Sequence, residues 1–156
     1  MDLLPHLVDL NADYARAIDN DELERWPDFF LDPCLYKVTT ADNLAHGYES
    51  GIIYADSRGM LQDRVTALRQ ANIYDRQRYR HIVGLPSILA RNGTELRVET
   101  PFLVVRTMRT GVMDLFATGR YLDVVPCDDE RQSLRFRERL VVCDGARFDT
   151  LVALPL

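Results

Sequence analysis

Three histidines and three cysteines are the side chains of this sequence best suited to binding a metal ion. The histidines, His6, His46 and His81, lie far apart, and no cysteine lies close to any of them. Zinc and iron–sulfur sites usually draw their ligands from short, recognisable spacings. We therefore predict that the chain binds no metal ion or cofactor of its own, although a site assembled from distant ligands stays open.

The sequence also lacks the motifs that mark a nucleophile or a phosphate site. It contains no G-x-S-x-G element and no glycine-rich loop for a phosphate or a dinucleotide. The cysteines, Cys34, Cys127 and Cys143, are odd in number and widely spaced. This pattern argues against a disulfide framework and favours reduced thiols in a cytoplasm, each acting as a small core residue.

General acid–base catalysis inside a pocket is the enzymatic alternative that the residue types leave open. It needs a histidine or carboxylate with a shifted pKa and a tyrosine that polarises the substrate. Nothing in the sequence shows that any two of the candidates meet; they are Tyr14, Tyr36, Asp42, His46, His81, Asp123 and Glu138. The simpler prediction for Asp123 is a pair with a neighbouring arginine, and for His81 a hydrogen-bonded structural role.

Length and charge narrow the classes of protein. A sequence of 156 residues predicts one domain over residues 1–156. A net charge of −5 argues against nucleic-acid binding, which needs a basic surface. No apolar run is long enough for a membrane span, and the first residues lack the basic region of a signal peptide, so we expect a cytoplasmic location.

The elements that would position these residues follow from hydrophobic periodicity. Helical spacing predicts helices over Leu3–Ile18, Glu22–Phe30 and Ser57–Tyr74. A period of two predicts strands at Leu35–Thr39, Arg80–Ala90, Leu96–Met108, Leu115–Val125 and Ser133–Cys143, with irregular chain over 40–56. Helices followed by successive strands indicate an α+β fold, in which helices pack on one face of a curved, mostly antiparallel sheet. Such a sheet forms a cone with a pocket inside.

Arginine supplies all but one of the 19 basic residues, the exception being Lys37. Genome composition is the simpler explanation, but arginine also suits ion-paired subunit contacts, because its guanidinium binds carboxylates bidentately. In the last strand the arginines alternate with apolar residues and are expected to face outward. Glu138 is in phase with the apolar set, so it is either buried with a partner or placed where the sheet face opens. The candidate subunit-contact residues are Arg76, Arg78, Arg80, His81, Arg135, Arg137 and Arg139.

Four stretches, in order along nearly the whole chain, resemble the small (β) subunits of aromatic ring-hydroxylating dioxygenases. They are Asp19…Asp28-Phe29-Phe30…Cys34…Tyr36, Met60–Val65 with Tyr79–Pro86, Phe116…Gly119–Asp123, and Leu134–Arg139 with Val142–Asp144. Each motif alone is loose, and their collinear order carries the resemblance. Stretches such as Trp26-Pro27 and Ala71–Tyr74 are most similar to subunits of enzymes that act on terephthalate, with salicylate-type enzymes second.

The resemblance implies a nuclear transport factor 2-like (cystatin-like) cone and a non-catalytic role in assembly. In this family the catalytic α subunit holds a Rieske 2Fe-2S cluster and a mononuclear iron. Three α and three β subunits usually assemble on a trimeric β base, and a reductase supplies electrons. The complex would cis-dihydroxylate an aromatic carboxylate, and no catalytic residue carries over to this chain.

Two alternatives stay beside this interpretation: a stand-alone cone-pocket enzyme, such as a dehydratase or isomerase, and a small-ligand binding module. Fold alone does not separate them, because one scaffold hosts many functions. A roomy polar pocket in which Asp42, His46 or His81 meet would favour the enzyme. An interior filled by apolar side chains, with apolar surface left exposed outside, would favour the subunit.

Overall fold

The computed structural model describes residues 2–47, 51–71, 77–128, 133–145 and 154–156. The elements in this part of the chain are, in order, α1 (Leu4–Asp19), the 3-10 helix η1 (Leu23–Phe29), β1 (Phe30–Thr40), α2 (Ala41–Ala45), β2 (Ile53–Ala55), α3 (Arg58–Gln70), β3 (Arg78–Val83), β4 (Ser87–Asn92), β5 (Glu95–Thr107), β6 (Met113–Pro126) and β7 (Phe136–Cys143). None of the described helices is long and apolar enough to cross a bilayer.

The two long helices form where local signals for a helix are strong. α1 has Pro5 in its first turn, where the missing N–H has no intrahelical partner to lose, and buries a face that includes Tyr14. α3 follows the N-cap Ser57, whose hydroxyl accepts a hydrogen bond from the Met60 N–H. The second predicted helix is a 3-10 helix, and Pro27 inside it lacks the N–H that a continuous α-helix would use.

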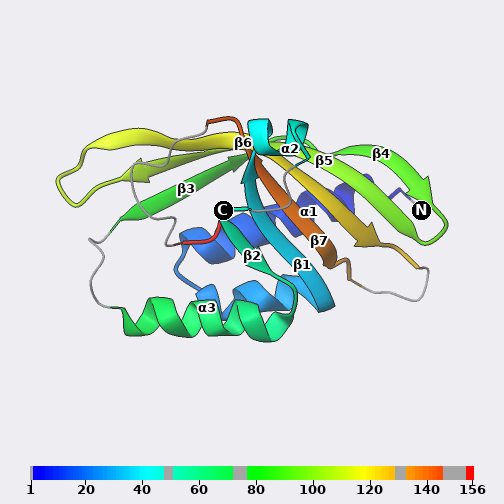
Figure 1. Ribbon diagram of the computed structural model, residues 1–156, viewed down its shortest axis with the longest axis horizontal. Helices are drawn as coiled ribbons and strands as arrows, with labels where there is room; N and C mark the ends of the chain where they lie inside the picture. Colours follow the sequence, from blue (N-terminus) through cyan, green and yellow to red (C-terminus); the bar gives the residue numbers. More distant parts are fainter. Residues whose placement is uncertain (1, 48–50, 72–76, 129–132, 146–153) are drawn as a thin grey trace.

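The described strands form one sheet in the order β2-β1-β7-β6-β5-β3, with β4 also paired to β5. The neighbouring strands are antiparallel except β1 and β7, the first and last strands of the sequence in this sheet. Figure 1 shows the sheet curving over α1, with α3 on the same side. The predicted α+β arrangement, with helices against a curved and mostly antiparallel sheet, is confirmed.

Two predictions of secondary structure, one of a strand and one of an irregular segment, are wrong in detail. The single strand expected over Arg80–Ala90 is broken into β3 and β4, which pair with opposite halves of β5. Gly84 lies at the break, and a Cβ there would be 2.6 Å from the Pro101 Cγ of β5, so a side chain does not fit. The segment expected to be irregular, 40–56, contains α2 and β2 in its described part.

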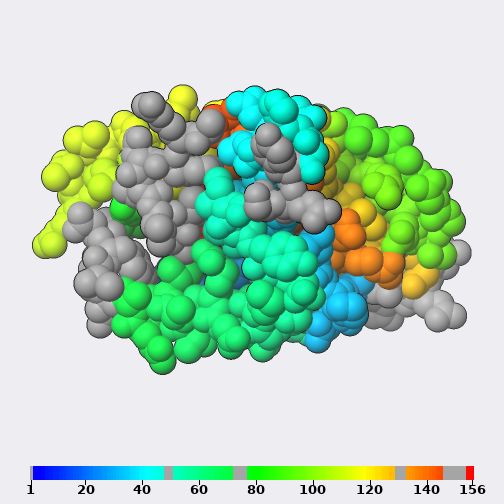
Figure 2. Space-filling view, in the orientation of Figure 1, coloured from blue at the N-terminus to red at the C-terminus, as the bar shows by residue number. Residues whose placement is uncertain are grey.

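The concave side of the sheet is filled where the sequence predicts a pocket. Its core is dominated by aromatic rings that are fully buried and meet mostly edge to face: Tyr14, Trp26, Phe30, Tyr36, Tyr121 and Phe136. In Figure 2 the atoms of β2 and α3 lie side by side across this face of the molecule. The interior of the cone is therefore a packed aromatic core.

Candidate functional site

A buried ion pair lies inside the cone. Arg139 of β7 and Asp123 of β6 are direct cross-strand partners, and their side chains are 0% and 1% exposed. Arg139 donates through Nε and Nη2 to the two carboxylate oxygens, over 2.9 and 2.8 Å. Nη2 also donates to Asn11 Oδ1 of α1, and Asn11 Nδ2 donates to Thr100 Oγ1 of β5 over 3.4 Å. This cluster joins helix α1 to three strands.

Aromatic rings surround the same guanidinium. Its carbon Cζ lies 3.8 Å from the ring centroids of Tyr121 and Phe136 and 4.4 Å from that of Tyr14. Such contacts favour a cation that has lost its water. Burial alone would lower the pKa of Arg139, but the Asp123 carboxylate beside it more than offsets this, so the pKa is raised. The guanidinium stays charged and is already held by the chain's own groups.

Tyrosine hydroxyls make a second set of polar contacts in this interior. Tyr14 and Tyr36 both donate to the carbonyl oxygen of Leu156, over 2.8 and 3.2 Å, and the Leu156 N–H donates to the Tyr36 hydroxyl over 3.1 Å. Trp26 Nε1 donates to the Tyr14 hydroxyl over 3.2 Å. Burial raises the pKa of Tyr14 and raises that of Tyr36 well above its ordinary value. Both hydroxyls are therefore protonated donors near neutral pH.

The acid–base candidates do not form a catalytic set. Tyr14, Tyr36 and Asp123 line the filled interior, and Asp123 is paired with an arginine, as predicted. Asp42 on α2 and His46 at its C-cap lie outside this interior, and His46 Nδ1 is 2.7 Å from the Asp42 carbonyl oxygen. The residues that the structure describes therefore do not bring the side chains of Asp42, His46 and His81 together in an interior pocket, the arrangement that would favour a stand-alone enzyme.

His81 is a hydrogen-bonded structural residue, as predicted. Its Nδ1 is 2.6 Å from Asp19 Oδ1, and its backbone N–H donates to Asp19 Oδ2 over 2.8 Å. The side chains of His81 and Asp19 are 0% and 4% exposed. The pair fastens the end of α1 to β3. The prediction of His81 as a subunit contact is wrong, because the imidazole is buried inside the chain.

The prediction that Arg139 faces outward is also wrong, and the register of β7 explains why. Phe30 pairs with Phe136 but Leu35 pairs with Glu138, so an irregularity separates the two ends of the β1–β7 ladder. The alternation of β7 changes phase there, which leaves Arg137 and Glu138 both exposed and turns Arg139 inward. Glu138 thus lies where the sheet face opens, one of its two expected positions.

The remaining arginines of the last strand lie on the surface. Arg137 is ion-paired with Glu95 and lines, with Glu138 and residues 31–35, a hollow of about 480 Å³. Arg135 is exposed just before β7. Arg76 lies outside the described residues. Whether Arg135 and Arg137 contact a partner stays a prediction.

The outer face of β3, β5 and β6 carries the other predicted contacts. Tyr79 and His81 of β3 are buried, so the alternating residues Arg78, Arg80 and Ile82 point away from the core. In the ladder Arg78 and Arg80 are in register with Thr107 and Val105 of β5, which pair with Met113 and Leu115 of β6. We call Arg78, Arg80, Ile82, Met113 and Leu115 the outer sheet patch.

Apolar surface dominates the outer sheet patch. Ile82, Leu115 and Met113 are 54%, 68% and 70% exposed. A hollow of about 710 Å³ adjoins it, lined by Arg78, Thr107, Met108, Arg109 and Gly111. The expectation that apolar surface remains exposed on the isolated chain is confirmed.

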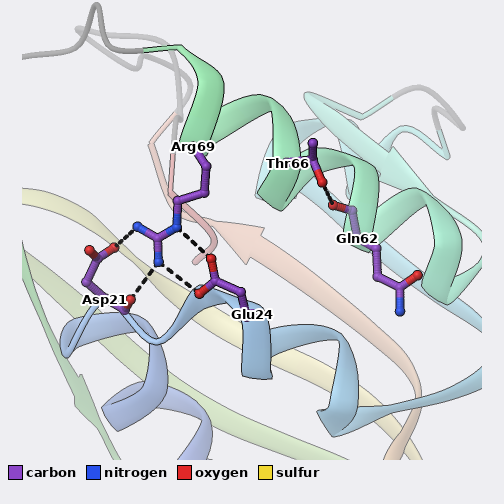
Figure 3. A network of polar contacts seen from close by, with 5 residues as sticks. All are labelled: Asp21, Glu24, Gln62, Thr66 and Arg69. Carbon is purple, nitrogen blue, oxygen red and sulfur yellow. Dashed lines mark hydrogen bonds and ion pairs between the residues drawn. The ribbon is translucent and has the colours of Figure 1, made fainter.

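A surface ion-pair cluster joins α3 to the start of η1 (Figure 3). Arg69 binds the Glu24 carboxylate through Nε and Nη2, over 2.7 and 3.0 Å. It also binds Asp21, through the carboxylate over 2.8 Å and through the carbonyl oxygen over 2.7 Å. The hydrogen bond from Arg69 lowers the pKa of Glu24 to about 2. This cluster docks one helix and presents no open site.

Nothing in the described residues resembles a metal site. No group of three or more His, Cys, Asp or Glu in this part of the chain could hold a metal ion. Cys34, Cys127 and Cys143 are free and buried, as expected of core residues. Burial raises the pKa of Cys34 to about 11 and that of Cys143 to about 12. Both thiols therefore disfavour the thiolate that binds metals and attacks substrates.

Three residues of these clusters escaped the sequence-based predictions. Asn11 carried a signal, since it lies on the apolar stripe of α1 and a polar residue in that position needs a buried partner. Asp19 belongs to a family-like stretch, but nothing in the sequence pointed to its contact with His81 or to the contacts of Leu156, because the partners lie 62 and 120 or more residues away. Long-range pairs of this kind leave no local pattern.

Comparison with known proteins gives concordant results. Residues 13–149 match the family described as "Ring hydroxylating beta subunit". The chain is 52% identical, over 94% of both chains, to a β subunit of the terminal oxygenase component of terephthalate 1,2-dioxygenase from Comamonas sp.. It is 36% identical to the small subunit of anthranilate 1,2-dioxygenase from Burkholderia cepacia, over 92% of this chain and 88% of that one.

A solved structure is similar over almost the whole chain. It is a β subunit assigned to an aromatic-ring-hydroxylating dioxygenase of Novosphingobium aromaticivorans, with a TM-score of 0.89 and 35% identity, covering 98% of this chain and 96% of that one. The predicted nuclear transport factor 2-like cone is confirmed by this likeness.

Proposed function

Because the chain belongs to the family of ring-hydroxylating β subunits, we propose that it is the non-catalytic β subunit of a dioxygenase that acts on terephthalate. The observation that carries the substrate is the 52% identity over 94% of both chains to the terephthalate relatives. A salicylate-type carboxylate is the second choice. The chain works as a component of an oxidoreductase whose catalytic partner is an α subunit.

The reaction chemistry is assigned to that partner. The α subunit would hold the Rieske 2Fe-2S cluster and the mononuclear iron, and a reductase would supply electrons to the complex. Two features of this chain support the division of labour. Its described interior is packed with aromatic rings around the ion pair of Arg139 and Asp123, and its buried thiols are poor ligands. Three α and three β subunits, with the β chains in contact, form the proposed assembly in the cytoplasm.

The outer sheet patch is the proposed surface for a partner subunit. Exposed apolar side chains ringed by arginines are typical of subunit interfaces, in which apolar area drives association and Arg orients it. Leu115→Asp would place a charge in the centre of that area, whereas Met60→Asp on α3, another exposed apolar position, is the matched control. Leu115→Asp is expected to lower recovery of the α subunit at least about tenfold.

Co-expression with the open reading frames that neighbour the gene for this chain, followed by purification and metal analysis, tests the function. The purified complex should contain both chains and iron, and should consume dioxygen with terephthalate when a matching reductase is supplied. Salicylate and anthranilate, offered separately, test the substrate. A chain that never associates with a Rieske-type partner and stays a compact monomer would refute the proposal.

A further inference from the structure

The segment Leu154–Leu156, called the plug here, occupies the interior of the cone. Leu156 is 0% exposed, Pro155 is buried, and Leu154 packs against the core cluster. Figure 1 marks the C end of the chain near the middle of the molecule. The plug belongs to no helix or strand. Its described polar contacts are the three hydrogen bonds between Leu156 and the hydroxyls of Tyr14 and Tyr36.

The wall around the plug is rich in hydrogen-bond donors. Two tyrosine hydroxyls converge on one oxygen, the Leu156 carbonyl. Two further polar groups, the Tyr121 hydroxyl and Arg139 Nη1, are buried without a hydrogen-bond partner among the described residues. The Tyr14 ring, whose hydroxyl contacts the plug, lies 4.4 Å from the Arg139 Cζ and 6.2 Å, between ring centres, from Tyr121. Arg139 and Tyr121 are therefore one ring away from the plug.

The rest of this interior is aromatic. The Trp26 and Tyr36 rings meet edge to face at 5.0 Å, and Phe30 packs against both. Apolar walls with a few converging polar groups are typical of sites for small molecules. Because the two tyrosine hydroxyls at the plug are donors, they suit a ligand with an oxygen acceptor, of which a carboxylate is the strongest.

We propose that the plug fills a latent binding site for a small aromatic carboxylate, and that this site opens when the plug withdraws. Withdrawal breaks no pair of strands, since the plug is outside the sheet. A segment of three residues held by few hydrogen bonds opens more easily than core strands. The ligand would replace the Leu156 carbonyl oxygen as the acceptor for Tyr14 and Tyr36, and the Leu156 side chain as the apolar filling.

The test uses the full chain, with benzoate as the probe. Leu156→Ala removes the apolar filling and keeps the backbone, and Leu89→Ala on β4, where the side chain is 58% exposed, is the matched control. Hydrogen exchange at the residue 156 amide reports withdrawal, and fluorescence of Trp26, the single tryptophan, reports binding. Leu156→Ala should speed that exchange at least about tenfold without affecting β5, and should bind benzoate more tightly than Leu89→Ala does.

A second substitution locates the ligand. Tyr36→Phe, added to Leu156→Ala, keeps the ring and removes one donor, so the affinity for benzoate should fall about tenfold. The proposal is overturned if residue 156 exchanges only with global unfolding in every variant. It also fails if Leu156→Ala binds benzoate no better than the control, or if Tyr36→Phe leaves the affinity unchanged. Should Leu156→Ala not fold, Leu156→Val carries the same comparison with a smaller change of volume.

Discussion

Two arginine–carboxylate clusters in this protein have similar geometry and opposite surroundings. Arg139 grips Asp123 with two nitrogens inside the cone, where both side chains are at most 1% exposed. Arg69 grips Glu24 with two nitrogens on the surface, where the carboxylate is 65% exposed. The bond lengths hardly differ. What differs is whether water can replace a partner that is lost.

This difference decides what each cluster does. If one member of the buried pair is removed, the other is left as an uncompensated charge in an aromatic core. If one member of the surface cluster is removed, water solvates the other, and little is lost. The buried pair therefore fixes how α1, β6 and β7 fit together, whereas the surface cluster only steadies α3. In an arginine-rich chain, the position of an arginine matters more than the number of arginines.

The largest effect is expected from breaking the buried pair. Arg139→Met leaves Asp123 without its partner and should lower the free energy of unfolding by about 3–5 kcal/mol. Denaturant unfolding followed by circular dichroism measures the loss. The double variant Arg139→Met with Asp123→Leu removes both charges and should recover part of it. A single variant that loses less than about 1 kcal/mol would contradict the structural role given to the pair.

A smaller loss of unfolding free energy is expected from breaking the contact between Asp19 and His81 at the end of α1. Asp19→Ala leaves two buried donors of His81, the backbone N–H and the ring N–H, without an acceptor. The expected loss of unfolding free energy is about 2–3 kcal/mol. Asp13→Ala, at an exposed position on the same helix, is the control and should change stability by less than about 0.5 kcal/mol. Equal losses in the two variants would refute the assignment.

The stability of the protein at high pH distinguishes buried tyrosines from exposed ones. Burial raises the pKa of Tyr79 to about 12 and raises those of Tyr36 and Tyr121 well above the ordinary value. Unfolded tyrosines lose their protons near pH 10, so stability should be unaffected below that pH and should fall as the pH rises toward 12. The slope is about 1.4 kcal/mol per pH unit for each tyrosine that stays protonated in the folded state.

Absorbance titration near 295 nm follows these hydroxyls directly. The folded chain should show a late, partly irreversible phase that coincides with unfolding, and Tyr36→Phe should reduce its amplitude. A titration completed near pH 10 while the chain stays folded would contradict the burial of these groups.

The smallest effect is expected at the surface cluster. Arg69→Ala should lower the free energy of unfolding by less than about 1 kcal/mol, and the loss should shrink as salt is added. Because the pKa of Glu24 is lowered to about 2, its contribution is present above its unfolded pKa of about 4.3 and fades as the pH falls toward 2. Denaturant unfolding of Arg69→Ala and Glu24→Gln, at low and high salt and at several pH values, measures the salt dependence and the pH dependence. A loss as large as that of Arg139→Met would erase the contrast between the clusters.

The parts of the fold that follow a regular period could be predicted from the sequence. α1 could be predicted because its apolar stripe recurs at helical spacing over several turns, and β5 and β6 because each spans more than ten residues between turns. The prediction failed at Arg139, because the extra residues of the irregularity lie in β1, between Phe30 and Leu35, and a sequence does not show which strand pairs with that stretch.

The polar clusters were only half predictable. A pair between Asp123 and some arginine was expected, but its place inside the cone depends on a cross-strand register that a sequence does not contain. The family resemblance, by contrast, depends on collinear motifs and not on contacts between distant residues. The sequence therefore predicted the function of the chain better than it predicted the clusters. The contacts of Leu156 with α1 and β1 could not be predicted at all, because they depend on how the whole chain folds.

The parallel pairing of β1 with β7 has a consequence for how the chain folds. Phe30 pairs with Phe136, so the ladder closes a loop of more than a hundred residues, and β1 has only the short β2 on its other side. Loops of this length close slowly, because their entropy is lost before the contacts between the two strands can form. During synthesis, β1 therefore stays unpaired on its long edge, with its aromatic side chains uncovered, until β7 has left the ribosome. We therefore expect the fold that other subunits recognise to form only near the end of synthesis, when β7 pairs with β1.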